Sequence, residues 1–279
     1  MRFLFLPCLV CRLSRVANHL NSIGRSPNRR SRRPLPVLAV VALCLGAAGA
    51  RAASFTVSDT SDSASDTNSL RYALSNLASG SAATTNTITI TATGTITLGS
   101  SLPTINNGVT ITGPGANQLT ISRANNYQVL EIGNGNSSVT VNISGLTIAN
   151  GHAVLGGAIA NFGTLTVTAC AFTGNFSGLG GAILTDNLLT LAGDTFIGNS
   201  VSAGSGGGGA IAVRRETSAG SELTVVDSTF IDNSVSIAAA NGGGAIENEG
   251  SATVTNSTFS NNSANGTGVI GGAILDEVG

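Results

Sequence analysis

The chain has 279 residues, of which 37 are glycine and 42% are hydrophobic. Its charge is unevenly placed. Residues 1–52 hold nine arginines and no acidic residue, whereas residues 53–279 hold 14 acidic residues, four arginines and no lysine, a net charge of −10. A nucleic-acid binder needs cations to neutralise phosphates, and a protein bound to an anionic leaflet needs a basic patch. Residues 53–279 therefore exclude both classes.

Residues 1–52 predict a secretory signal peptide with a long basic n-region. Four arginines between 29 and 33 precede an apolar run at 37–48, and Ala-Arg-Ala follows at 50–52. The apolar run is shorter than the roughly 20 residues that a membrane-spanning helix needs, so a cleaved signal fits better than an anchor. We expect a processed chain without a membrane span, secreted or displayed at a bacterial outer membrane or cell surface.

Processing leaves one cysteine, Cys170, and one histidine, His152. A single thiol forms no internal disulfide, and neither residue has the partners for a Cys- or His-based metal site. The acid-rich stretch at 59–66 lacks the D-x-[DN]-x-[DN]-G calcium pattern. We therefore expect no metal, no cofactor and a packed, unreactive Cys170.

Residues 53–84 are predicted to form an N-terminal cap. A short strand near 55–57 and a polar loop come first. Apolar residues at 70, 73, 74 and 77 then follow a helical spacing, with Asn68 or Ser69 as the N-cap. One amphipathic helix ahead of many strands suits a solenoid, because the first open strand edge needs a cover.

Residues 85–279 are dominated by short strands rich in threonine, isoleucine and valine, punctuated by glycine, asparagine and proline. The clearest segments are 87–91, 94–98, 109–112, 119–122, 139–143 and 146–148. Their alternation of apolar and small polar residues gives each strand one buried and one exposed face. No helical pattern separates them, which excludes a βαβ sheet.

A two-part repeat occupies the C-terminal half. Gly-Gly-Ala-Ile occurs five times, with its glycines at Gly156 and Gly157, Gly180 and Gly181, Gly208 and Gly209, Gly243 and Gly244, and Gly271 and Gly272. Phe-x-x-Asn follows the first four, at Phe172 and Asn175, Phe196 and Asn199, Phe230 and Asn233, and Phe259 and Asn262. Units of conserved internal order with loops of free length indicate stacked structural repeats.

The repeat length decides among a flat sandwich, a barrel and a β-helix. About 24 residues are too many for one hairpin and suit three short strands plus turns, which make one coil. Stacked coils place equivalent residues about 4.8 Å apart. We therefore predict an all-β, right-handed parallel β-helix with a short N-terminal capping helix. The phenylalanines should form an internal stack, the asparagines an amide ladder, and the glycines a tight or positive-φ turn.

The two motifs resemble those of the chlamydial polymorphic outer membrane proteins and of the broader right-handed parallel β-helix repeat proteins. The resemblance covers residues 156–274, and the segment 69–74 is similar to the cap module that often precedes such repeats, with Asn68 and Tyr72 replacing its Cys and Glu. It implies an exported autotransporter passenger with adhesive roles. That family continues into a C-terminal barrel, whereas this chain stops after the fifth Gly-Gly-Ala-Ile, so we expect a truncated passenger.

The resemblance and the composition together predict an adhesin-like or structural envelope protein, a monomeric rod without a catalytic site. Its partners would be a host-surface protein, matrix or glycan. Two inserts between strands, at 202–207 and 214–221, are the expected contact loops. Within them Arg214, Arg215 and Glu216 are the candidate partner-contact residues.

The alternative is a polysaccharide lyase or glycoside hydrolase on a β-helix scaffold. A lyase needs a cationic base, for which Arg123 and the pair Arg214 and Arg215 are the candidates. A hydrolase needs two facing carboxylates, and the candidates are Asp194, Asp227, Asp232, Glu247 and Glu249. Glu247 and Glu249 should point the same way on an extended segment, but no aromatic platform lies near them in the sequence. We therefore rank catalysis below binding.

Overall fold

The computed structural model describes residues 52–78, 85–123, 126–134, 136–202, 206–215, 220–236, 241–265, 268 and 270–277. The chain divides into two compact units, Met1–Ala48 and Gly49–Gly279, and the described residues all belong to the second. The predicted signal peptide, except Ala52, lies outside them. Within the described part, no helix has the length and apolar character needed to cross a bilayer.

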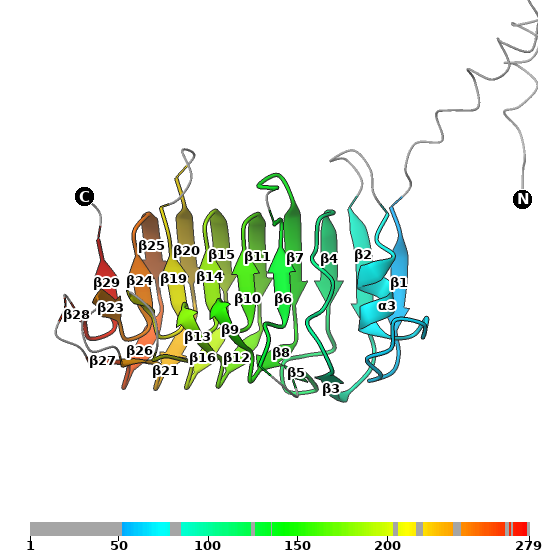
Figure 1. Ribbon diagram of the computed structural model, residues 1–279, viewed down its shortest axis with the longest axis horizontal. Helices are drawn as coiled ribbons and strands as arrows, with labels where there is room; N and C mark the ends of the chain where they lie inside the picture. Colours follow the sequence, from blue (N-terminus) through cyan, green and yellow to red (C-terminus); the bar gives the residue numbers. More distant parts are fainter. Residues whose placement is uncertain are drawn as a thin grey trace, which may run out of the picture. The chain divides into compact units, whose positions relative to one another are not determined.

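The second unit is a parallel β-helix, as the sequence predicts. Its described strands form five sheets, in which strands of successive coils pair in parallel and lie side by side along the stack (Figure 1). Sheet 1 contains β1 (Ser54–Val57), β2 (Asn86–Ile90), β4 (Val109–Thr112), β7 (Thr140–Ser144), β11 (Thr164–Thr168), β15 (Leu188–Ala192), β20 (Glu222–Val226) and β25 (Ser251–Thr255).

The other sheets follow in chain order around the coil. Sheet 2 contains β3 (Gly94–Leu98), β5 (Leu119–Arg123), β8 (Thr147–Ala149), β12 (Ala171–Thr173), β16 (Thr195–Ile197), β21 (Thr229–Ile231) and β26 (Thr258–Ser260). Sheet 3 contains β9 (His152–Leu155), β13 (Phe176–Leu179), β17 (Ser200–Val201), β22 (Ser234–Ser236) and β27 (Ser263–Asn265). Sheet 4 contains β6 (Leu130–Ile132), β10 (Ile159–Asn161), β14 (Ile183–Thr185), β19 (Ile211–Val213), β24 (Ile246–Asn248) and β29 (Ile274–Asp276). Sheet 5 contains β18 (Gly206–Gly208), β23 (Asn241–Gly243) and β28 (Ile270–Gly271).

One coil runs from β10 through β11, β12 and β13, after which β14 stacks on β10 with Ile183 beside Ile159. The coil thus carries four short strands where the repeat length predicts three. The additional strand is β13, which follows Phe-x-x-Asn and pairs with β9 and β17. Its sequence, Phe-Ser-Gly-Leu, has no alternating apolar pattern, so the two-residue period does not reveal it.

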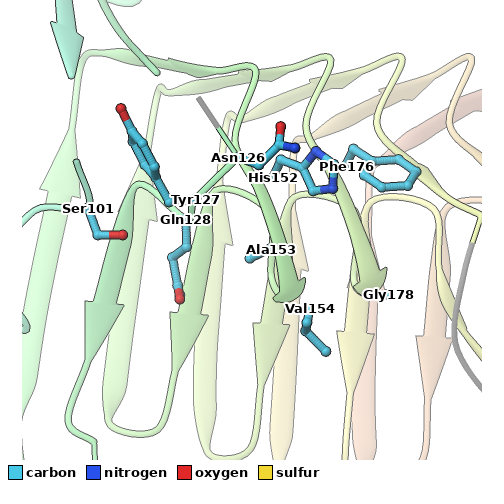
Figure 2. Close-up of a pocket in the computed structure, with 9 residues that line it drawn as sticks. All are labelled: Ser101, Asn126, Tyr127, Gln128, His152, Ala153, Val154, Phe176 and Gly178. Atoms are coloured by element: carbon cyan, nitrogen blue, oxygen red, sulfur yellow. The ribbon is translucent and has the colours of Figure 1, made fainter. Parts of the chain in front are cut away.

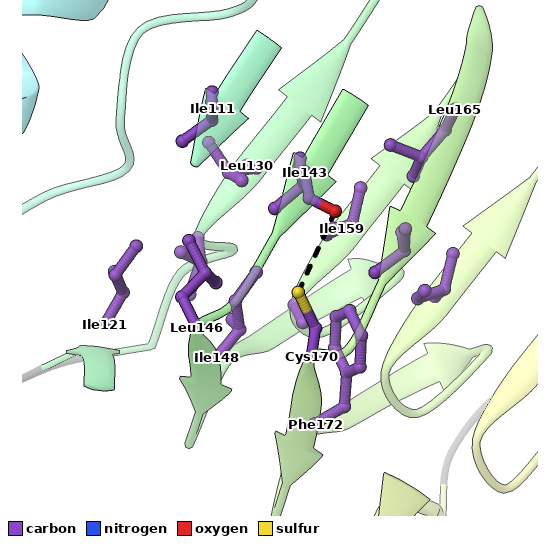
Figure 3. Packing of buried hydrophobic residues seen from close by; sticks show 14 of the residues in the cluster. Ile111, Ile121, Leu130, Ile143, Leu146, Ile148, Ile159, Leu165, Cys170 and Phe172 are labelled. Atoms are coloured by element: carbon purple, nitrogen blue, oxygen red, sulfur yellow. Dashed lines mark hydrogen bonds between the residues drawn. The ribbon is translucent and has the colours of Figure 1, made fainter. Parts of the chain in front are cut away.

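Inward-facing side chains of sheet 1 form aliphatic columns that hold the stack together. One column passes through the buried residues Ile88, Ile111, Ile143, Val167, Leu191 and Val225. Cys170 packs into the same core, with its Sγ 3.9 Å from the carbonyl oxygen of Ile143 (Figure 3). Burial raises the pKa of the Cys170 thiol to about 12. The thiol is therefore protonated and packed, as the sequence predicts.

The four repeat phenylalanines form the predicted stack. Phe172, Phe196, Phe230 and Phe259 are register partners in sheet 2. Neighbouring ring centroids lie 4.7 Å apart, and the ring planes are within 5° of parallel. The first three rings are fully buried, and Phe259 is partly buried. The stack confirms that successive coils keep the same register.

The repeat asparagines form the predicted amide ladder. The Oδ1 of Asn199 accepts from the backbone N–H of Asn175 at 3.0 Å and from its Nδ2 at 2.9 Å. The Nδ2 of Asn199 donates to the carbonyl oxygen of Phe172 and to the Oδ1 of Asn233. Asn233 and Asn262 continue the same arrangement. Each internal amide uses its two acceptor and two donor positions, which is how a buried polar side chain avoids a desolvation cost.

The glycine pairs let neighbouring coils approach closely. A Cβ on the second glycine would lie 2.0 Å from the carbonyl oxygen of the next coil at Gly181, and 2.1 Å at Gly209. At the first glycine the Cβ would meet a carbonyl of its own coil, for example 2.0 Å from Ile159 O at Gly156. Gly156 and Gly180 also have φ values of 55° and 64°. The predicted tight turn is present, and close approach is the requirement that these pairs share.

The predicted capping helix is α3 (Leu70–Ser75), which lies beside β1 at the start of the stack (Figure 1). Its N-cap is Ser69, whose Oγ accepts from the backbone N–H of Tyr72 at 3.1 Å. Leu70, Ala73 and Leu74 are buried against the first coil. The helix is shorter than predicted at its C-terminal end, because Asn76 already leaves helical geometry.

Candidate functional site

A surface groove of about 500 Å³ lies beside β9 and β13, and we call it the β9 groove. Its volume falls within the range of about 300–1,000 Å³ that is typical of ligand pockets. The residues that line it are Ser101, Asn126, Tyr127, Gln128, His152, Ala153, Val154, Phe176 and Gly178 (Figure 2). None of these nine residues carries a carboxylate.

The groove exists because sheet 3 ends at β9. Four later coils each place a strand in this sheet, but the coil before β9 has residues 126–128 at this position instead of a strand. The backbone N–H of His152 donates to the carbonyl oxygen of Tyr127 at 3.1 Å, which ties β9 to that segment. Side chains from the irregular segment therefore stand beside the edge of the sheet.

Three ring side chains from successive coils follow one another along the groove: Tyr127, His152 and Phe176 (Figure 2). His152 and Phe176 are register partners, with ring centroids 4.5 Å apart and planes at 76°. In the following coils the same column carries serine, at Ser200 and Ser234. The rings are thus a local departure from the repeat and are not required by the fold.

The polar groups of the groove are neutral. The Tyr127 hydroxyl donates to the carbonyl oxygen of Leu98, which fixes the ring. Burial, and then the positive charge of Arg123, lower the pKa of His152, so the imidazole is uncharged at pH 7. The Nη1 of Arg123 donates to the Oδ1 of Asn126 at 3.1 Å. Such a lining suits an uncharged ligand that has both apolar and hydroxyl surface.

The predicted partner-contact residues differ in how they are held. Arg214 forms a two-pronged ion pair with Asp186 of the preceding coil, Nε to Oδ1 at 3.0 Å and Nη2 to Oδ2 at 2.9 Å. Arg215 is exposed, and its backbone N–H donates to Glu249. Glu216 lies outside the described residues. Arg214 thus joins coils, and partner contact by Arg214, Arg215 and Glu216 stays a prediction.

Carboxylates gather at one place in the described part of the C-terminal coils. Oxygen atoms of Glu247, Glu249 and Glu277 all lie within 4.8 Å of one another. Glu247 is 5% exposed, and its pKa is raised to about 7 by burial and then by repulsion from Glu249 and Glu277. Oxygen ligands at this spacing are what a hard cation such as calcium uses. The absence of a metal site therefore stays a prediction.

The structure brings Glu247 and Glu249 together, as the sequence predicts, and adds Glu277. The repeat itself contains the signal for Glu277, because it follows Gly271 at the same distance as Glu249 follows Gly243. The other candidate acids lie apart from this group: Asp194 is buried, and Asp227 is exposed at a turn with a φ of 52°.

Asp232 is likewise exposed at a positive-φ turn, and Arg123 lies next to the β9 groove. The groove is not predicted from the sequence, where His152 is considered only as a metal ligand and Phe176 is not compared with the serines at its place in later repeats. That comparison would have exposed Phe176 as an outlier, whereas Tyr127 belongs to an irregular segment that no periodicity marks.

Comparison with family models, with curated proteins and with solved structures finds no match to this chain. The resemblance to the chlamydial repeat family thus rests on the Gly-Gly-Ala-Ile and Phe-x-x-Asn motifs alone.

Proposed function

We propose that the chain is a secreted or surface-displayed β-helix passenger that acts by binding, as an adhesin-like or structural envelope protein without catalytic activity. The observation that carries the proposal is a division between core and surface, because different residues form the contacts between coils and the groove. The repeat phenylalanines and asparagines, and the glycine pairs of the first four units, are engaged between coils, whereas the non-repeating residues, such as Phe176, form the β9 groove.

This division supports a scaffold that can vary its surface without losing its fold. Solenoids bind partners through extended coil faces and loops, and the β9 groove is open along such a face. The signal-like leader and the acidic composition support export of the scaffold. The partners we propose are a host-surface protein, matrix or glycan.

To test the proposal, the full chain is expressed in a bacterial host. Cell fractionation and protease treatment of intact cells locate the protein, and the exported product is then applied to arrays of matrix proteins, host-surface proteins and glycans. We expect an exported product, cleaved near Ala52, that retains at least one ligand on the arrays. A product that stays in the cytoplasm, or an exported one that retains no ligand, contradicts the binding function. The second result would leave a structural envelope role.

A second candidate, a glycoside hydrolase, is favoured by the cluster of Glu247, Glu249 and Glu277. Retaining glycosidases place their two carboxyl groups about 5 Å apart, with one acid of raised pKa. Glu247 has the raised pKa and lies within 4.8 Å of the other carboxylates. Its burial leaves little room for a sugar, so this function ranks second. Release of reducing ends from polysaccharides, abolished by Glu247→Gln, would establish it.

A further inference from the structure

We propose that the β9 groove binds a neutral, pyranose-containing oligosaccharide that lies along the stack axis. The inference rests on the proposed binding function and assigns it a site and a ligand class. Three features of the groove support it: a row of rings, a set of neutral hydrogen-bonding side chains, and an open end of sheet 3.

The rings supply the apolar part of the site. Pyranose rings present C–H groups on their faces, and aromatic side chains bury such surfaces with a defined geometry. Tyr127, His152 and Phe176 come from three successive coils, and the His152 and Phe176 centroids are 4.5 Å apart. A ligand that touches all three must therefore extend across coils, which a chain of linked sugars does.

The polar side chains supply the specificity. Ser101, Asn126 and Gln128 line the groove with a hydroxyl and two amides, and an amide offers both a donor and an acceptor to neighbouring sugar hydroxyls. The uncharged imidazole of His152 adds a further donor or acceptor. Because none of the lining residues carries a carboxylate, nothing in the groove calls for a cationic ligand.

A peptide strand is the competing occupant, because β9 ends its sheet and peptides can extend an exposed edge. The geometry disfavours it. The His152 N–H on the groove side already donates to the Tyr127 carbonyl oxygen, so an added strand would have to displace this bond. Val154, which is 77% exposed, forms an apolar rim. Both an oligosaccharide and a peptide could contact this rim, so Val154 does not discriminate between them.

The experiment measures binding by isothermal titration calorimetry with exported protein from cells that express the full chain. The probes are β-linked tetrasaccharides of glucose, mannose and xylose, a galacturonate tetrasaccharide, and an extended aromatic-rich peptide. The test variants are Phe176→Ser and His152→Ser, which place in the column the serine that later coils carry. Ile197→Ser is the matched control, because Ile197 is 38% exposed and Ser260 occupies its column two coils later.

We expect at least one neutral tetrasaccharide to bind, each test variant to weaken it at least about tenfold, and the control to leave it unchanged. Far-UV circular dichroism checks that each variant is folded. Binding of only the galacturonate or the peptide, or equal binding by the test variants, overturns the proposal. If the arrays still show adhesion in that case, only the ligand assignment fails. If the arrays show none, the binding function fails with it.

Discussion

The amide ladder is the most direct place to perturb the fold, and Asn199→Ala is the substitution that isolates it. The Asn199 side chain bonds four groups: the backbone N–H and Nδ2 of Asn175, the carbonyl oxygen of Phe172, and the Oδ1 of Asn233. Three of them keep another partner after truncation. The Nδ2 of Asn175 still donates to Ile148, and the Oδ1 of Asn233 still accepts from the Asn199 backbone. The Phe172 carbonyl belongs to β12, which stays paired with β16.

The remaining group, the Asn175 N–H, loses its bond to the Asn199 Oδ1 in a site where Asn175 is fully buried. A buried polar group left unsatisfied costs about 1–3 kcal/mol, so the substitution should destabilise the protein by about 2 kcal/mol. Asn265→Ala is the control, because Asn265 is exposed, and its cost should stay within about 0.5 kcal/mol.

Urea unfolding followed by far-UV circular dichroism measures the change in unfolding free energy. Because a stack of coils can unfold in parts, hydrogen exchange of the Asn175 amide provides a local reading. We expect faster exchange there in Asn199→Ala and parental exchange in Asn265→Ala. A loss below about 1 kcal/mol, with the Asn175 amide still protected, would refute the claim that the ladder satisfies the buried Asn175 N–H.

Three further predictions test other parts of the scaffold. Burial raises the pKa of Asp194 to about 7. The stability that the protonated Asp194 contributes is therefore complete below about pH 4 and is lost as the pH rises through 7. As the pH rises from 4 to 8, the unfolding free energy of Asp194→Ser should increase by up to about 4 kcal/mol relative to that of the parent. Parallel pH–stability curves for the two proteins would contradict this. Gly209→Ala places a Cβ 2.1 Å from a carbonyl oxygen and should cost about 3 kcal/mol. Gly272→Ala, with open space around its Cβ, should cost little in the same unfolding assay. Phe230→Ala removes a ring stacked on both sides and should cost about 3–5 kcal/mol. Phe259→Ala, at a partly buried ring, should cost less; equal costs would speak against the stack.

The sequence predicts the scaffold well because its signals repeat. Equivalent residues recur at one place in each coil, so Phe196 over Phe172 and Asn199 over Asn175 follow from spacing alone. Alternation of threonine with isoleucine likewise marks β2 and β4 of sheet 1. The fourth strand of the coil was not predicted because β13 has no alternating pattern and is extended by pairing with its neighbours.

The candidate site is less predictable for the same reason. The β9 groove depends on an interruption of the repeat, where residues 126–128 replace a strand and rings replace serines. No local propensity encodes the proximity of Tyr127 to His152, since it follows from how an irregular segment meets the end of a sheet. Periodicity reports what successive coils share, and the candidate site lies where they differ.

This contrast has a physical consequence for how such a protein can change. The free energy of the stack is stored in interactions between equivalent residues, such as the Phe230 ring with its two neighbours. The half-exposed rings of the groove contribute to no such column beyond the contact of His152 with Phe176. Substitutions of His152 and Phe176 should therefore alter the proposed ligand binding with little effect on unfolding, whereas ladder substitutions should do the reverse. A solenoid built this way can change a few surface residues of the groove while the interactions between its coils keep the same register.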